Sequence, residues 1–258
     1  MAFLPVPKLL KWEYSLSQKY TCPESVLITS GCSFTSSTLQ LDTAASWPGF
    51  VVDRCRFNYC IDYSFPGAGN EYIADSILNY FSTITDNEIS KYKVIIMWSG
   101  IDRQEKKQVD GDIFYNSHNY PKINNISYHR IQSEYVDRVK STQCSVEKIF
   151  EVYNYLNSRN ISFAFTFYSN LLFPPYMPKR DTTHHFEDYE NSNTLNKLKT
   201  ISWIPSNPMD YLYEYAFVND FLNHGDYFHP PNQCNLQWTD NVLLPSLVKI
   251  GLISPIDH

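Results

Sequence analysis

The sequence predicts an α/β fold in which helices cover both faces of a central, mostly parallel sheet. Four short apolar segments are rich in β-branched or aromatic residues, and each runs into Gly, Pro, Ser or Asn, as buried strands of parallel sheets do. These segments are residues 25–30, 58–64, 93–99 and 161–169. Helix-like stretches separate them, and this alternation of strand and helix predicts a three-layer α/β/α sandwich.

The stretch 70–84 has the clearest helical pattern. Its apolar residues recur at the spacing of one helix face, and Asn70 is expected to be the N-cap. The apolar residues are Ile73, Ile77, Leu78 and Phe81. A longer helix is predicted over about 133–158, and two more near 209–223 and 238–249.

One domain spanning residues 1–258 is predicted, because the sequence contains no repeat and no linker rich in Pro, Gly or Ser. Two connections, 104–132 and 170–208, are too long to be simple links. Long loops at the carboxyl ends of parallel strands line the binding crevice, so we expect both to lie over the site. The run "RQEKK" at 103–107 is interpreted as a solvated mixed-charge face.

Composition excludes several classes of function. The net charge of −6 gives no attraction to a phosphate backbone, so no nucleic-acid partner is expected. No run approaches the roughly 18 apolar residues that cross a bilayer, and the N-terminal segment lacks the apolar core of a signal peptide. We therefore expect a soluble protein without a signal peptide. The six cysteines show no C-x-x-C, which favours mostly free thiols in a reducing compartment.

Two polar clusters carry candidate chemistry. The first, "ITSGCSFTSS" at 28–37, places Cys32 and Ser33 directly behind a buried strand. The second is Asp226 followed three residues later by His229, before the last helix. A carboxylate can fix the tautomer of a histidine and leave the other ring nitrogen as a general base. Read locally, either Ser33 or Cys32 is a possible nucleophile, but neighbouring side chains point in opposite directions, so only one can face His229.

The segment "THHFEDYE" at 183–190 offers a possible metal site. It contains His184, His185, Glu187 and Asp188. The two adjacent histidines share no face in either a helix or a strand, so a solvated lid segment is favoured over a metal site. No metal and no cofactor are expected.

Four patches, in order along most of the chain, resemble the SGNH (GDSL-type) hydrolase family in the variant whose first block reads G-C-S-F-T. They are "TSGCSFTSS" (29–37), "YSFPGAGNEYIADSI" (63–77), "VIIMWSGIDR" (94–103) and "DYFHP" with a following Trp (226–238). The resemblance implies a flavodoxin-like α/β/α sandwich and a serine esterase. It makes Ser33 the nucleophile and Cys32 its packing neighbour, with His229 and Asp226 completing the catalytic triad.

The resemblance also implies an oxyanion hole. It would be formed by the Ser33 N–H, the Gly69 N–H and a side-chain amide, for which Asn70 is the candidate if it is not simply the helix N-cap. The third patch departs from the family pattern, because Ile101 stands where the family has Asn, and Ser99 where it has Gly. Isoleucine donates no hydrogen bond. Either Asn70 or the Ser99 hydroxyl replaces the missing donor, or the enzyme is slow, or the protein is not an enzyme.

The aromatic and hydroxyl-rich loops suit stacking on sugar rings, so the expected activity is hydrolysis of an ester or O-acetyl group on a carbohydrate. The alternative is a catalytically weak or inactive module of the same fold, which recognises glycans or serves in phage assembly. The expected location is cytoplasmic or virion-associated, and because the variant resembles proteins of bacteria and their viruses, a phage protein is one of the alternatives. The expected partner is a small-molecule or glycan ester, and the sequence does not predict the oligomeric state.

Overall fold

A computed structural model gives the fold. It describes residues 8–10, 20–22, 24–36, 46–100, 103–109, 123, 126–130, 137–173, 192–223 and 229–256. None of the helices in these ranges is both long enough and apolar enough to cross a membrane. The six cysteines are free thiols, as predicted, and five of them are buried.

A five-stranded sheet forms the centre of the fold, with the strand order β1-β4-β3-β5-β8. The strands are β1 (Lys8–Leu10), β3 (Val26–Gly31), β4 (Tyr59–Asp62), β5 (Tyr92–Trp98) and β8 (Ser162–Phe167). Neighbouring strands from β4 to β8 are parallel, whereas β1 runs antiparallel on the β4 edge. The four strands predicted from sequence are confirmed. The edge strand β1 was not predicted, because its three residues carry no alternating pattern.

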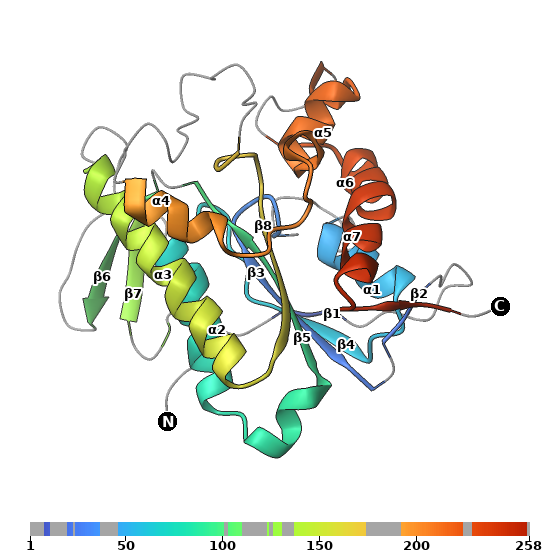
Figure 1. The fold of residues 1–258 in the computed structure, drawn as a ribbon, viewed down its shortest axis with the longest axis horizontal. Helices are drawn as coiled ribbons and strands as arrows, with labels where there is room; N and C mark the ends of the chain where they lie inside the picture. Colours follow the sequence, from blue (N-terminus) through green and yellow to red (C-terminus); the bar gives the residue numbers. More distant parts are fainter. Residues whose placement is uncertain are drawn as a thin grey trace.

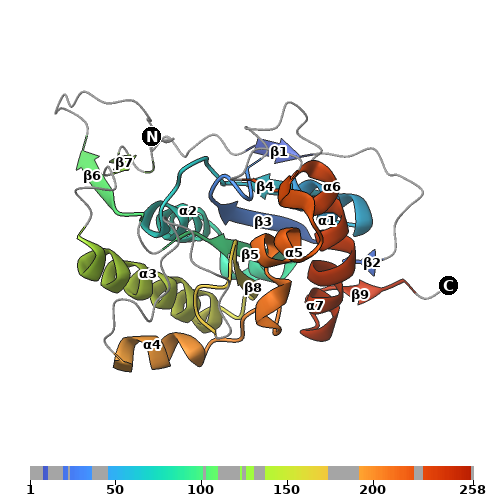
Figure 2. The ribbon, with the colours of Figure 1, turned by 90° about the horizontal axis from the view of Figure 1, so that it is seen from above.

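Helices cover both faces of this sheet (Figures 1 and 2). The helices are α1 (Trp47–Arg54), α2 (Asn70–Ser82), α3 (Arg138–Ser158), α4 (Ser192–Lys199), α5 (Leu212–Val218), α6 (Asn232–Trp238) and α7 (Leu244–Lys249). In Figure 1, α2, α3 and α4 lie on one side of the sheet, and α1, α6 and α7 lie on the other. The predicted three-layer α/β/α sandwich is confirmed.

The central strands are buried because both faces of the sheet are covered. Every residue of β3 is buried, and Ile28 on β3 and Ile95 on β5 have no exposed surface. Much of the large aromatic content lies in this core, where Trp47, Trp98 and Trp238 are also fully buried. The apolar strand runs therefore specify the centre of the fold.

Short elements modify the predicted helices near the carboxyl end. The stretch predicted near 209–223 is α5 flanked by 3₁₀ turns at Pro208–Asp210 and Phe221–Asn223. The last helical region begins with α6 and passes through a π-helical turn at Thr239–Leu243 into α7. Proline at position 245 cannot donate the next helical hydrogen bond, which accounts for a change of pitch at this point.

Both long connections contain regular structure. Strands β6 (Glu105–Val109) and β7 (Ile126–Arg130) pair antiparallel within the first connection and lie beside α2 and α3 (Figures 1 and 2). Helix α4 lies within the second. A small separate pair, β2 (Tyr20–Thr21) with β9 (Ser254–Pro255), joins segments near the two ends of the chain. The segment 104–132, expected to be a long loop, thus contains a β-hairpin in its described part.

Candidate active site

The turn that follows β3 presents Ser33 at the carboxyl edge of the sheet. Two backbone N–H groups, of Thr35 and Ser36, donate to the Cys32 carbonyl oxygen at 3.0 and 2.9 Å, so the chain turns sharply after Gly31. A Cβ atom on Gly31 would collide with the side chain of Thr35 and would lie 2.9 Å from the Met97 carbonyl oxygen of β5. The glycine and the threonine of the G-C-S-F-T block are thus coupled by packing.

Ser33 and His229 meet across the carboxyl edge of the sheet. The Ser33 Oγ lies 2.7 Å from the His229 Nε2, although the two residues are 196 positions apart. Both side chains are only partly buried, so a substrate can reach them. A serine hydroxyl in hydrogen-bond contact with an imidazole is the arrangement from which a histidine base activates a serine nucleophile.

Aromatic rings hold the imidazole in place. The rings of Phe34 and His229 have centroids 5.0 Å apart, and Phe34 in turn lies 4.7 Å from Tyr168, which follows β8. The Arg103 guanidinium carbon lies 6.0 Å from the centre of the Tyr168 ring. Neither Phe34 nor Tyr168 was predicted from the sequence as a site residue, because aromatic residues are most often core residues.

The structure brings Ser33, and not Cys32, to His229. Cys32 has no exposed surface and faces the core, whereas Ser33 is partly exposed. Of the two candidate nucleophiles, the structure favours Ser33 over Cys32, as the family resemblance implies. Asp226, Ile101 and the segment 183–190 lie outside the described residues, so the third triad member and the proposed lid stay predictions.

Asn70 connects three elements of the fold. Its Nδ2 donates to the Ser99 carbonyl oxygen at 3.3 Å and to the Ser145 Oγ at 3.0 Å, and its Oδ1 accepts the Ser99 N–H at 2.8 Å. The residue is only 1% exposed. The N-cap prediction was wrong, because Gly69 is the N-cap and Asn70 is the first helical residue. Both amide hydrogens are already used, so Asn70 links α2 to the end of β5 and to α3.

Gly69 allows the segment 103–105 to pass close to the start of α2. Its N–H donates to the Glu105 Oε1 at 2.8 Å. A Cβ atom at this position would lie 2.5 Å from the Arg103 carbonyl oxygen and 2.7 Å from the Glu105 Cδ, which is too close for any other residue. The N–H group that the family resemblance assigns to the oxyanion hole is thus committed to a carboxylate in this structure.

Ser99 differs from Gly69 and Asn70 in the hydrogen bonding of its potential donor. The side chain is fully buried, and its Oγ has no hydrogen-bond partner among the described residues. The β3–β5 register pairs Gly31 with Met97, so Ser99 follows the end of β5 alongside the turn that carries Ser33. Of the three residues predicted to complete the oxyanion hole, Ser99 has the side-chain donor without a hydrogen-bond partner in the described part of the chain.

Glu105 is a site residue that sequence reasoning missed. It was interpreted as part of a solvated charge run, yet it is only 6% exposed and its carboxylate binds the start of α2. This interpretation was wrong because the partners of Glu105 are backbone N–H groups, which leave no trace in the sequence. Burial raises the pKa of Glu105 to about 7, against the opposing effect of these two hydrogen bonds.

A cavity of about 370 Å³ opens between the starts of α2 and α3 and the segment 103–107. Its lining is polar or charged apart from Cys144, and Arg103 belongs both to this lining and to the aromatic group beside His229. In the ranges that the structure describes, no three His, Cys, Asp or Glu side chains are grouped so as to hold a metal ion. The site therefore offers a serine, a histidine and a polar cavity.

Comparison with known proteins gives the fold. No family model matches the sequence, and no curated protein matches it. Among solved structures, the psychrotrophic esterase EstA from Pseudoalteromonas sp. aligns with a TM-score of 0.50 at 11% identity, over 88% of this chain and 98% of the esterase. A member of the lipolytic protein G-D-S-L family from Veillonella parvula aligns with a TM-score of 0.47 at 10% identity, over the same shares of the two chains. The chain therefore has the fold of a bacterial esterase, the α/β/α sandwich that its resemblance to the SGNH hydrolases implies.

Proposed function

We propose that the protein is a serine esterase of the SGNH type, which hydrolyses an ester or O-acetyl group. The observation that carries this proposal is the 2.7 Å contact between the Ser33 Oγ and the His229 Nε2 at the carboxyl edge of the sheet. Ligands of open α/β sheets bind at this edge. The fold shared with an esterase supports the same class of reaction, although a fold does not fix a function.

In the proposed reaction, the Ser33 Oγ attacks the ester carbonyl carbon as its proton passes to the His229 Nε2. The tetrahedral intermediate collapses when His229 returns that proton to the leaving alcohol, and the acyl group stays on Ser33. Water then attacks the acyl-enzyme, with His229 as base, and releases the carboxylic acid. In this scheme the Asp226 carboxylate accepts a hydrogen bond from the N–H on the other ring nitrogen and holds the imidazole in orientation.

The negative charge on the carbonyl oxygen needs donors that are already in place. We propose the Ser33 N–H and the Ser99 hydroxyl for this role. The support for Ser99 is its buried Oγ without a partner in the described ranges and its place beside the Ser33 turn. Gly69 and Asn70 are less suited, because their N–H groups already donate to Glu105, Ser99 and Ser145.

The proposed substrate class rests on the cavity that shares Arg103 with the aromatic group around His229; neither Ser33 nor His229 lines this cavity. Its lining side chains are charged or polar apart from Cys144, so they offer hydrogen-bonding groups to a hydroxylated ligand. A volume of about 370 Å³ is at the lower end of small-ligand pockets. We propose that the cavity receives the hydroxylated part of an acetylated carbohydrate, with Arg103 between it and the aromatic group around His229.

The test is labelling by a fluorophosphonate probe together with turnover of p-nitrophenyl acetate. The esterase EstA is described as inhibited by monoethylphosphonate, so a phosphonate reagent suits this fold. The wild type is expected to react, Ser33→Ala to be inert, and Ser82→Ala, which changes an exposed serine on α2, to react like the wild type. Equal turnover by the wild type and Ser33→Ala would refute the proposal. Acetate release from acetylated glycans, compared with hydrolysis of long-chain acyl esters, tests the substrate class.

A second candidate is a module of this fold that binds glycans or serves in assembly with little or no catalysis. The observation that favours it is the commitment of the Gly69 and Asn70 donors inside the fold, together with Ile101 in the sequence. It predicts a folded protein that binds acetylated glycan in calorimetry but leaves the fluorophosphonate probe unreacted. Labelling of Ser33 at a rate above that of free serine contradicts it.

A further inference from the structure

We propose that Glu105 is a positioning residue for the active site: its carboxylate holds the start of α2, and with it the loop that lies against the Ser33 turn. This inference rests on the proposed esterase function. Glu105 contacts neither Ser33 nor His229 in any bond described, so it acts through the loop between β4 and α2.

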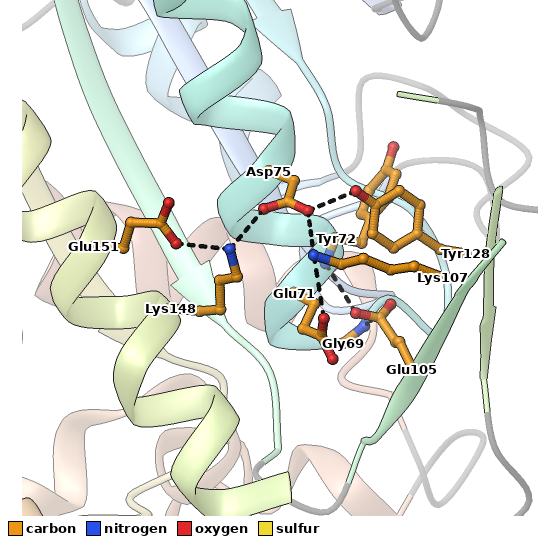
Figure 3. Close-up of polar contacts among 9 residues, drawn as sticks. All are labelled: Gly69, Glu71, Tyr72, Asp75, Glu105, Lys107, Tyr128, Lys148 and Glu151. Atoms are coloured by element: carbon orange, nitrogen blue, oxygen red, sulfur yellow. Dashed lines mark hydrogen bonds and ion pairs between the residues drawn. The ribbon is translucent and has the colours of Figure 1, made fainter. Parts of the chain in front are cut away.

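Glu105 supplies the cap that α2 lacks in its own sequence. The first N–H groups of a helix have no partner within the helix, and a side chain at the N-cap usually satisfies one of them. The N-cap here is Gly69, which has no side chain to offer. The Glu105 Oε1 accepts the Gly69 N–H and its Oε2 accepts the Tyr72 N–H, both at 2.8 Å (Figure 3). One carboxylate from β6 thus makes both hydrogen bonds of a capping box, which ordinarily come from two residues of the helix itself.

The loop that ends at this cap begins beside the nucleophile. Continuing the parallel ladder, the Tyr63 N–H donates to the Thr29 carbonyl oxygen at 2.8 Å and the Phe65 N–H donates to the Gly31 carbonyl oxygen at 3.0 Å. Gly31 is two residues before Ser33. The loop is therefore fixed to the Ser33 turn at one end and to Glu105 at the other, over fewer than ten residues.

An ion-pair network fixes the strand that carries Glu105. The Lys107 Nζ lies 2.7 Å from Asp75 and 3.2 Å from Glu71, both on α2. Asp75 also accepts the Tyr128 hydroxyl of β7 at 2.6 Å and pairs with the Lys148 Nζ of α3 at 3.0 Å (Figure 3). These contacts dock the β6–β7 hairpin on α2 independently of the cap. These bonds fix β6, the strand that carries the Glu105 carboxylate, against α2.

The protonation state of Glu105 controls how completely it caps the helix. Among the described residues, the charged and titratable groups around it are Glu71 and Asp75 on α2, Lys107 on β6, Tyr128 on β7, Lys140, Cys144 and Lys148 on α3, and Arg103. Burial, with a smaller contribution from the Glu71 and Asp75 carboxylates, raises the pKa of Glu105 to about 7. An ionised carboxylate accepts both N–H groups, whereas a protonated carboxyl has a hydroxyl facing one of them. The cap is therefore complete above about pH 7 and weakens below it.

The experiment compares Glu105→Gln with the wild type. The amide keeps the size of the side chain and one acceptor, but it turns an NH₂ group toward the other backbone N–H. We expect kcat/KM for p-nitrophenyl acetate at pH 8 to fall about tenfold or more, on the scale of a lost charged hydrogen bond. Glu88→Gln, at an exposed carboxylate outside the network, is the matched control and is expected to keep wild-type activity.

The pH profile separates positioning from a purely structural role. In the wild type, protonation of Glu105 adds its own fall in kcat/KM to the loss caused by protonation of the His229 base, so log kcat/KM falls with a slope steeper than one near pH 7. In Glu105→Gln the slope is expected to be one. An unchanged kcat/KM, or a fall in activity that leaves the slope at its wild-type value, overturns the inference.

Hydrogen exchange keeps the two proposals distinguishable. If the wild type shows no Ser33-dependent turnover, the proposed function fails, and the cap is judged on the exchange rates of the Gly69 and Tyr72 amides. Faster exchange of these two amides in Glu105→Gln than in Glu88→Gln supports the cap. Equal rates overturn it. Glu105→Ala, which removes both acceptors, is expected to exceed Glu105→Gln in each effect.

Discussion

Asn70 and Ser99 bind each other through two hydrogen bonds, one in each direction. The Ser99 N–H donates to the Asn70 Oδ1 at 2.8 Å, and the Asn70 Nδ2 donates to the Ser99 carbonyl oxygen at 3.3 Å. A side-chain amide thus acts as a backbone partner for the residue just beyond β5. This pair joins α2 to the end of β5, at the carboxyl edge of the sheet. It occupies the Asn70 side chain, whereas the Ser99 hydroxyl takes part in neither bond.

The first prediction concerns Asn70→Ala. The change leaves the Ser99 N–H and carbonyl oxygen buried without their partner, and it also removes the bond to Ser145. We expect the free energy of unfolding to fall by about 2–4 kcal/mol, measured by urea denaturation. Asn79→Ala is the control, because the Asn79 Nδ2 has no hydrogen-bond partner in the described ranges, and its cost should be clearly smaller. Full stability with abolished turnover would instead assign Asn70 to the oxyanion.

The second prediction concerns Ser99→Ala, whose hydroxyl has no hydrogen-bond partner among the residues that the structure describes. Removing an unsatisfied buried hydroxyl is neutral or stabilising, so the unfolding midpoint in urea should stay or rise. If Ser99 donates to the oxyanion, kcat for p-nitrophenyl acetate should fall by about a hundredfold or more. A wild-type kcat in this variant removes Ser99 from the mechanism.

The third prediction concerns Gly31→Ala, a steric test of the turn. Because the new methyl group would meet the Thr35 side chain and the Met97 carbonyl oxygen, the turn must shift. We expect a loss of about 1–3 kcal/mol or more in unfolding free energy, as for other overpacked sites, together with a loss of Ser33 labelling. The comparison variant Gly251→Ala enters open space and bears only the cost of its positive φ of 73°, so it should leave labelling intact. Equal labelling of the two variants contradicts the expected coupling between Gly31 and the nucleophile.

The fourth prediction concerns the buried carboxyl group of Glu214 on α5. Its Oε1 accepts the Ser169 hydroxyl at 2.6 Å, and burial raises its pKa from 4.5 to about 7. A raised pKa means that the folded state holds a proton that the unfolded state has already released between about pH 4.5 and 7. The stability that this group contributes is complete below pH 4.5 and is lost as the pH rises through 7.

The variant Glu214→Gln tests whether the free energy of unfolding falls as the pH rises. Urea denaturation of the wild type at pH values from 5 to 8 should show unfolding free energy falling with pH, by at most about 1.4 kcal/mol per pH unit for each proton. In Glu214→Gln the unfolding free energy should fall less steeply with pH. Glu105→Gln should reduce the slope by a similar amount, because burial also raises the pKa of Glu105. A dependence that is equally steep in wild type and Glu214→Gln contradicts the assignment.

The strands and the Ser33–His229 pair could be predicted because the sequence contains their causes. Apolar runs such as the one around Ile28 form strands buried in the core. A serine that follows one strand and a histidine that precedes the last helix meet at the carboxyl edge of a parallel sheet. The β6–β7 hairpin could not be predicted from its residues. Its stability comes from ion pairs such as Lys107 with Asp75, and these join positions that the sequence does not relate.

Asn70 and Glu105 show the same limit at the site itself. The sequence placed Asn70 correctly at the start of a helix, but its Ser145 partner lies 75 positions away on α3, and this contact decides its role. Glu105 was misread because its partners are the N–H groups of Gly69 and Tyr72. Side-chain types are visible in a sequence, whereas the backbone groups that they satisfy are not.

The residue that caps α2 is synthesised well after α2 itself. Glu105 lies 36 positions downstream of Gly69, so during synthesis the chain contains all of α2 before it contains the residue that caps it. The chain must extend beyond β6 before that end can be sealed, and β6 gains its partner strand only after β7 emerges. The loop beside the nucleophile therefore takes its final form well after the nucleophile itself has left the ribosome.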